Sequence, residues 1–153
     1  MAEDSLIADI KKIIKWSLDE VNMGGEDAES LVFATGMAES GYKVLSQYGD
    51  GPAVGFFQCE PATMRDIWDN FVMYRSDLKT KLYGLGYDEE NDRMRLQSSI
   101  ALQAIFCRIK YRRDSHPLPK HDDLMAQAKY WKRVYNSHLG KGTVEHFMEM
   151  NDA

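Results

Sequence analysis

One carboxylic acid in this chain, Glu39, has sequence neighbours that favour a general acid. It ends an apolar stretch, and the aromatic residues Tyr42, Phe56 and Phe57 follow soon after it. Burial among such side chains disfavours the charged carboxylate, and the C-terminus of a helix disfavours negative charge as well. Both effects raise a pKa, so Glu39 is predicted to hold a proton near neutral pH. A carboxyl in that state can protonate the leaving oxygen of a glycosidic bond.

Two further carboxylates, Asp50 and Glu60, decide which reaction is open to such an acid. An inverting hydrolase needs a base roughly 6.5–9.5 Å from the acid, with room for a water molecule. Asp50 lies in a Gly-rich loop, where it could supply this base, although a role in shaping the turn at 49–52 is favoured. Glu60 precedes Pro61 and is suited either to capping a helix or to lining a cleft.

The elements that must position these residues follow from the apolar spacing and the Gly and Pro punctuation. A helix is predicted from residue 26 or 27 to 39, and Gly41 suits the positive φ of a helix end. Residues 42–57 have no helical period and predict a loop with at most a short hairpin. Pro61 predicts the first turn of the next helix.

The remainder of the chain also predicts helices, and the strand signal is weak throughout. No repeat, low-complexity stretch or linker divides the 153 residues, so the predicted fold is a mostly α single domain spanning 1–153. A small β-hairpin beside the active-site cleft is the only β-element expected. The further helices are predicted at 5–22, 61–72, 76–82, 91–112, 122–136 and 143–150.

Composition and charge exclude several classes of partner. The net charge of −5 disfavours a general nucleic-acid binder, and the longest apolar run, 31–38, is too short to span a membrane. The N-terminus shows no basic region followed by an apolar one, so no secretory signal is expected.

The four histidines have no metal-ligand spacing, and no metal or organic cofactor is predicted. Cys59 and Cys107 are predicted to be buried free thiols, and the chain is expected to be a monomer.

Three motifs occur in order along this chain: Glu39-Ser40-Gly41, Gly55-Phe56-Phe57-Gln58, and Pro61-Ala62-Thr63. In this order they resemble the soluble lytic transglycosylases of the lysozyme-like superfamily, which are related to goose-type lysozymes. That family's later motif, Ala-Tyr-Asn-Ala-Gly, is echoed by Val134-Tyr135-Asn136. The resemblance covers roughly residues 30 to 140. The stretch 131–136, followed by Gly140-Lys141-Gly142-Thr143, is similar to small phage-type members.

The resemblance implies a lysozyme-like fold and cleavage of the β-1,4 bond between N-acetylmuramic acid and N-acetylglucosamine in bacterial peptidoglycan. Glu39 would then serve as both acid and base, because lytic transglycosylases lack a second carboxylate. Gln58 would hydrogen-bond the sugar, and Tyr135 would reach Glu39 or the sugar and orient the acid. The remaining residues implied to bind substrate are Ser40, Phe57 and Asn136.

Two alternatives to transglycosylation stay open. A muramidase would hydrolyse the same bond with Asp50 or Glu60 as the second carboxylate, and many relatives carry an apolar residue at the position of Glu60. A non-catalytic murein-binding module of a virion would keep the fold without the reaction. A phage-encoded protein of this kind would be virion-associated, or would be released from the host cytoplasm to the periplasm through a holin.

Overall fold

The fold is a set of helices packed around a central one, α6 (Ile100–Arg112). The computed structural model describes residues 2–47, 51–136 and 140–152, and within these ranges it is mostly helical with almost no strand. The prediction of a mostly α protein is therefore confirmed. The helices are α1 (Ala2–Glu20), α2 (Glu26–Glu39), α3 (Pro61–Asn70), α4 (Ser76–Gly84), α5 (Asp92–Ser98), α6 (Ile100–Arg112), α7 (Leu124–Tyr130) and α8 (Val144–Asn151). The described residues also include the 3₁₀ turns η2 (Val72–Tyr74) and η3 (Glu89–Asn91) and a π-helical segment, η4 (Trp131–Asn136).

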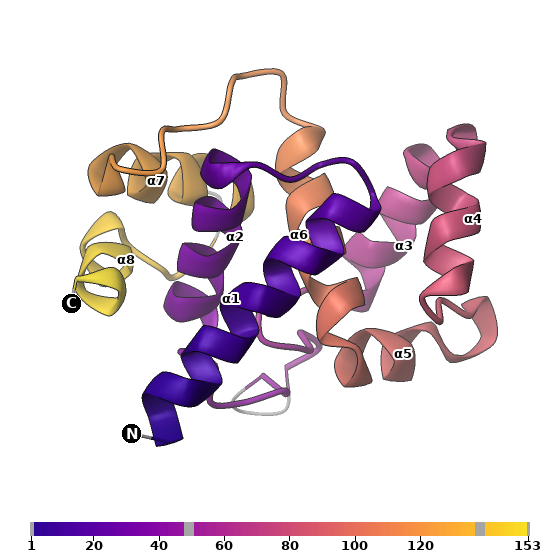
Figure 1. The fold of residues 1–153 in the computed structure, drawn as a ribbon, viewed down its shortest axis with the longest axis horizontal. Helices are drawn as coiled ribbons and strands as arrows, with labels where there is room; N and C mark the ends of the chain where they lie inside the picture. Colours follow the sequence, from indigo (N-terminus) through magenta and orange to yellow (C-terminus); the bar gives the residue numbers. More distant parts are fainter. Residues whose placement is uncertain (1, 48–50, 137–139, 153) are drawn as a thin grey trace.

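The centre of the molecule is occupied by α6, which is buried on most sides. A helix of this kind is a core helix rather than a surface one. The long helix α1 crosses in front of α6 and also packs on α2 (Figure 1). From α1, Ile10, Ile14 and Leu18 are fully buried and recur at spacings of four. The buried residues of α6 are Leu102, Gln103, Ala104, Ile105, Phe106, Cys107, Arg108, Ile109 and Tyr111.

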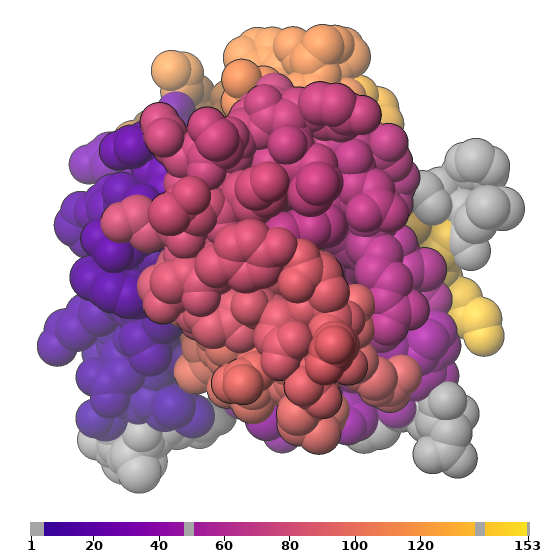
Figure 2. All heavy atoms as spheres, turned by 90° about the vertical axis from the view of Figure 1, so that its right-hand side faces the viewer, coloured from indigo at the N-terminus to yellow at the C-terminus, as the bar shows by residue number. Residues whose placement is uncertain are grey.

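The other helices lie on two opposite sides of this centre. The helices α7 and α8 pack together on one side, where α8 also packs along α2, and α3, α4 and α5 lie on the other side (Figure 1). Figure 2 looks at the molecule from the side of α4 and shows α4 and α5 forming much of that surface. The end of α2 therefore lies close to elements from the C-terminal part of the chain.

The segment predicted as one helix over 91–112 is two helices, and that prediction is wrong. Ser99 interrupts it in an extended conformation, with φ −113° and ψ 108°. Its hydroxyl accepts a hydrogen bond from the Leu102 N–H at 3.1 Å and so caps α6. Serine side chains compete for backbone donors in this way, which favours a helix start over a helix interior.

The loop after α2 contains a small β-element, as predicted. Val54 forms isolated antiparallel bridges with Ser46 and with Cys59. The Gly55 N–H also donates to the Leu45 carbonyl at 2.8 Å. Val54 is thus paired with a residue on each side of it in the sequence, Ser46 before it and Cys59 after it, within the loop between α2 and α3.

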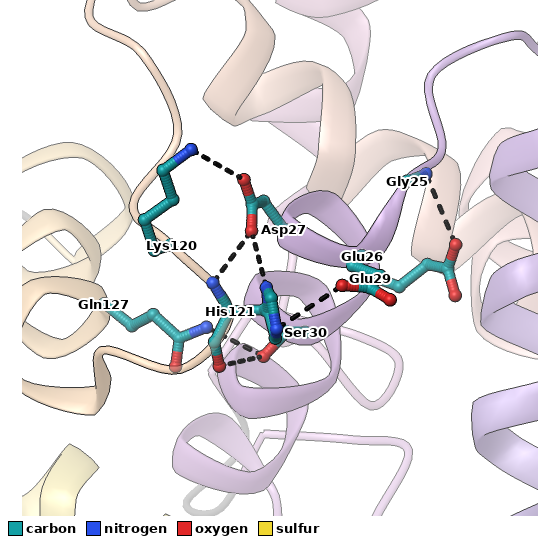
Figure 3. Close-up of polar contacts among 8 residues, drawn as sticks. All are labelled: Gly25, Glu26, Asp27, Glu29, Ser30, Lys120, His121 and Gln127. Carbon is teal, nitrogen blue, oxygen red and sulfur yellow. Dashed lines mark hydrogen bonds and ion pairs between the residues drawn. The ribbon is translucent and has the colours of Figure 1, made fainter.

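A polar joint attaches the segment before α7 to the first turn of α2 (Figure 3). The His121 backbone N–H donates to Asp27 Oδ1 at 2.8 Å, and the His121 Nδ1 lies 3.0 Å from the same oxygen. The His121 Nε2 lies 3.3 Å from Glu26 Oε2. Hydrogen bonds from His121 hold the pKa of Asp27 below its usual value. The joint fixes the start of the helix that ends at Glu39.

Cys59 and Cys107 are free and buried, which confirms the prediction made for them. Burial raises the pKa of the Cys59 thiol to about 12 and that of Cys107 further. Both therefore stay protonated at neutral pH and act as small apolar side chains. No helix in the described part of the chain has the length and apolar character needed to cross a membrane.

Candidate active site

A cleft of about 330 Å³ brings together side chains from widely separated parts of the sequence. The end of α2 supplies the acid, the loop before α3 supplies an amide, α6 supplies a lysine, and η4 supplies a tyrosine and an asparagine. Of the candidates named from sequence, Glu39, Gln58, Glu60, Tyr135 and Asn136 line this cleft. The other described residues that line it are Gln47, Ala53, Thr63, Lys110 and Gly140.

Glu39 is the last residue of α2, at the place where its chain direction changes. Gly41 follows with φ 63°, and its N–H donates to the carbonyls of Gly36 and Met37 at 3.0 Å each. Only glycine takes this left-handed conformation without strain, so the helix stops here and Glu39 faces the cleft. The helix end that Gly41 predicts is therefore confirmed.

The pKa of Glu39 is raised from 4.5 to about 7, chiefly because burial disfavours its charged form. A hydrogen bond from Trp131 and the electrostatic effects of Lys110 and His146 lower the pKa and partly offset this effect. A carboxyl that titrates near neutral pH can exist in both protonation states during one reaction cycle. This property suits a group that first donates a proton and then takes one back.

Trp131 is a partner of Glu39 that sequence reasoning missed. The indole N–H donates to Glu39 Oε2 at 3.0 Å, and the side chain is 1% exposed. Trp131 lies four positions before Tyr135, a spacing that places two residues on one face of a helix. That spacing was the available signal, since Tyr135 already belonged to the candidate site.

Tyr135 lines the cleft, while its hydroxyl makes a hydrogen bond inside the protein. The hydroxyl donates to the Phe57 carbonyl at 2.6 Å, so its partner is this backbone oxygen and not Glu39. The ring stacks on Tyr111 with centroids 5.4 Å apart. The Lys110 ammonium lies 4.1 Å from the centroid of the same ring and donates to the Tyr135 carbonyl at 2.8 Å. The Tyr135 ring is thus held in place on several sides.

Gln58 lines the cleft from a strained backbone position. Its φ is 51°, a left-handed conformation that non-glycine residues rarely adopt. Its side-chain Nε2 donates to the Gly55 carbonyl at 2.9 Å, across a tight turn in which Gly55 has φ 82°. A Cβ on Gly55 would lie 2.7 Å from the Cδ of buried Gln103, whose Oε1 accepts from the Phe56 N–H. Strain of this kind is often found where a side chain must be presented to a ligand.

Ser40 and Phe57 are placed differently from the other candidates. The Ser40 hydroxyl donates to the Phe56 carbonyl at 2.6 Å and accepts from the Tyr42 N–H at 3.0 Å, so it ties the end of α2 to the loop. The Phe57 side chain is 1% exposed and belongs to the core. The ring does not line the cleft, so the structure gives no support to the predicted contact between Phe57 and substrate. Its carbonyl instead fixes Tyr135.

Asn136 completes the floor of the cleft at the end of η4. Its Oδ1 accepts from the Lys132 Nζ at 2.8 Å, and the same ammonium donates to the Gly140 carbonyl at 3.0 Å. A π-helical turn such as η4 is rare and is frequently found at functional sites. Here it carries Trp131, Tyr135 and Asn136 toward the end of α2.

Of the two candidates for a second carboxylate, Glu60 and Asp50, the structure describes only Glu60. Glu60 is exposed at the cleft, and it occupies the N-cap position of α3 without a capping hydrogen bond from its side chain. Its side chain is thus free to face the cleft, contrary to the capping interpretation. Asp50 lies outside the described residues.

Within the described ranges, no group of three His, Cys, Asp or Glu side chains is placed to hold a metal ion. No protein-family model, curated protein or solved structure matches this chain. The cleft itself is therefore the basis of the function proposed below.

Proposed function

We propose that this protein has a lysozyme-like fold and degrades bacterial peptidoglycan as a lytic transglycosylase, cleaving the β-1,4 bond between N-acetylmuramic acid and N-acetylglucosamine. The observation that carries the proposal is the position of Glu39. Its pKa is raised to about 7, and it lines one cleft with Gln58, Tyr135 and Asn136. The presence of these motif residues in one cleft with a carboxyl of raised pKa supports the proposal over an unrelated helical protein.

In the proposed reaction Glu39 acts twice. Its proton passes to the glycosidic oxygen as the bond to the muramic C1 breaks, and N-acetylglucosamine leaves with a free hydroxyl. The C6 hydroxyl of the muramic residue then attacks C1, and Glu39 takes up the proton that this hydroxyl loses. The product is a 1,6-anhydromuramic end, no water is consumed, and Glu39 returns to its starting state.

The other cleft residues are suited to binding the sugars. Gln58 and Asn136 offer amide groups to acetamido and hydroxyl groups, and the Tyr135 ring provides a rigid wall. Lys110 places a positive charge in the cleft, where it favours the carboxylate that Glu39 becomes after proton transfer. The second step, in which the carboxylate acts as a base, needs this charged form to be accessible.

A muramidase that hydrolyses the same bond is the second candidate. The observation that favours it is Glu60, whose side chain is exposed at the cleft and makes no cap for α3. In that mechanism Glu60, or Asp50, would activate a water molecule against C1. The third candidate, a murein-binding virion module without activity, is disfavoured because binding alone gives no reason for the raised pKa of Glu39. Our proposal also includes a phage origin for the protein, with delivery in the virion or through a holin.

The test uses purified peptidoglycan sacculi and mass spectrometry of the released fragments. Wild-type protein is expected to release fragments with anhydromuramic ends, and Glu39→Gln is expected to release almost none while keeping the fold. Glu149→Gln, a change at an exposed position of α8, serves as the matched control and should retain activity. Fragments with free reducing ends would show that the protein is a muramidase and not a transglycosylase. Full activity of Glu39→Gln would refute the assignment of Glu39 as the acid.

A further inference from the structure

The carboxyl of Glu39 has an asymmetric environment. The Trp131 indole N–H donates to Oε2 at 3.0 Å, and among the described residues it is the only hydrogen-bond donor to this carboxyl. Glu39 lines the cleft, whereas the Trp131 side chain is 1% exposed and lies behind it. One carboxyl oxygen is thus engaged from the protein side, and the other accepts no hydrogen bond from any residue that the structure describes.

The indole itself is held firmly by the C-terminal part of the chain. Its ring packs on Phe147 of α8 with centroids 5.2 Å apart. A Cβ on Gly142 would lie 2.4 Å from the Trp131 Cη2, so the backbone at Gly142 approaches the indole as closely as a glycine allows. The helix α8 also reaches α2 directly, since the His146 Nε2 lies 2.8 Å from the Ala38 carbonyl. Trp131 and the end of α2 are therefore fixed relative to each other.

We propose that Trp131 is a positioning residue, which holds Glu39 Oε2 as an acceptor and so keeps the acid proton on Oε1, toward the cleft. In a neutral carboxyl the carbonyl oxygen is the better hydrogen-bond acceptor, so an N–H fixed at Oε2 favours the tautomer with the hydroxyl at Oε1. The inference rests on the proposed function for its catalytic meaning, although its physical content concerns Glu39 and Trp131 alone.

The same contact has a predictable effect on protonation. A donor to the carboxylate favours the charged form, so Trp131 lowers the pKa of Glu39 and offsets part of the effect of burial. Removing that donor should raise the pKa by roughly half a unit to one unit. The other titratable groups whose charges act on Glu39, or are acted on by it, are Lys110, Cys107 and Tyr111 on α6, Tyr135 on η4, and His146 on α8.

The first experiment observes the contact between Trp131 and Glu39 with the Trp131 indole in place. The chain has three tryptophans, so Trp16→Phe and Trp68→Phe identify by elimination the indole N–H signal of Trp131 in a nitrogen-correlated NMR spectrum. This signal is expected to move with pH around a midpoint near 7, and the movement should vanish in Glu39→Gln. A Trp131 signal that ignores pH between 5 and 9 would overturn the proposal.

The second experiment removes the donor while keeping an aromatic ring. In Trp131→Phe, the carboxyl titration of Glu39, followed by carbon NMR of labelled glutamate, should shift upward by roughly half a unit to one unit. The peptidoglycan-cleaving rate should fall, and its loss at high pH should shift upward in parallel, because the active acid is the protonated form.

The control is Trp68→Phe, a change at another buried tryptophan, which is 4% exposed and stacks on Tyr87. It should lower stability without moving the titration of Glu39. An equal shift in both variants, or none in Trp131→Phe, would show that Trp131 only fills space. If wild-type protein cleaves no peptidoglycan but the titration shifts as expected, the proposed function fails and the positioning role stands.

Discussion

The hydroxyl of Tyr135 donates to the carbonyl of Phe57 at 2.6 Å, and this bond joins two parts of the cleft that lie 78 positions apart in the sequence. One end of the bond is in η4, and the other immediately precedes Gln58. The position of Gln58 in the cleft therefore depends on a side chain from the far end of the chain. A tyrosine that was expected to orient the acid instead holds the loop that carries the amide.

The Tyr135–Phe57 contact leads to the first prediction. Tyr135→Phe removes the hydroxyl and leaves a buried carbonyl without its partner, which should cost about 1–3 kcal/mol of unfolding free energy. Because Gln58 then loses its support, KM for peptidoglycan fragments should rise more than kcat falls. Denaturant unfolding and steady-state kinetics measure the two effects. Tyr74→Phe, at a side chain that is 79% exposed, is the control and should change neither.

The raised pKa of Glu39 gives the second prediction, which concerns stability. Between pH 4.5 and about 7 the folded protein binds more protons at Glu39 than the unfolded chain does, so stability falls as pH rises through this window. At about 1.4 kcal/mol for each pKa unit, and discounted for partial exposure, the charged form costs the folded state about 2 kcal/mol above pH 7.

Glu39→Gln should remove that cost, because the amide oxygen can still accept the bond from Trp131. The variant is expected to exceed wild type in unfolding free energy by about 2 kcal/mol at pH 8, and to match it near pH 4. Denaturant titrations at the two pH values test this. A stability difference that does not depend on pH would show that the Glu39 carboxyl titrates near its ordinary pKa.

Much of the backbone that positions Glu39 could be predicted from the sequence, because the ends of helices depend on local chemistry. Gly41 marks the end of α2 through its positive φ, and Pro61 marks the first turn of α3. The break at Ser99 was missed because the apolar spacing continues across it, although serine is a common helix cap. The contact of Trp131 with Glu39 spans 92 positions, and the only local signal for it was the spacing of Trp131 from Tyr135.

The third prediction concerns Glu60 and separates the two reactions. If the protein is a transglycosylase, Glu60→Gln should keep its cleavage rate within a few-fold of wild type, because no base is needed to activate water. The released fragments should keep their anhydromuramic ends. Mass spectrometry and rate measurements on the same sacculi test this. A loss of activity as complete as that in Glu39→Gln would instead make Glu60 the second carboxylate of a muramidase.

The fourth prediction concerns Gly142, whose backbone lies against the Trp131 indole. In Gly142→Ala the new methyl group would meet the indole at 2.4 Å and the Asn136 Nδ2 at 3.0 Å. Overpacking of this kind typically costs about 1–3 kcal/mol, and here it would also displace the donor to Glu39. Thermal unfolding and the cleavage rate should therefore both decline.

Gly84→Ala provides the control for this substitution, since beyond its own chain neighbours and helix backbone nothing lies within 4 Å of a Cβ built at Gly84. It should leave the cleavage rate unchanged. Equal activity in Gly142→Ala and wild type would mean that the indole can shift without consequence for the acid.

The two buried thiols give this cleft an internal reporter of its own opening. Cys107 lies near enough to Glu39 and Tyr135 for these groups to influence its pKa, and Cys59 follows Gln58 directly. Both thiols are protonated and buried in the core, so a thiol reagent can react only when the packing around them opens. The rate of labelling therefore measures how often the packing behind the acid comes apart, and a bound glycan strand should slow it.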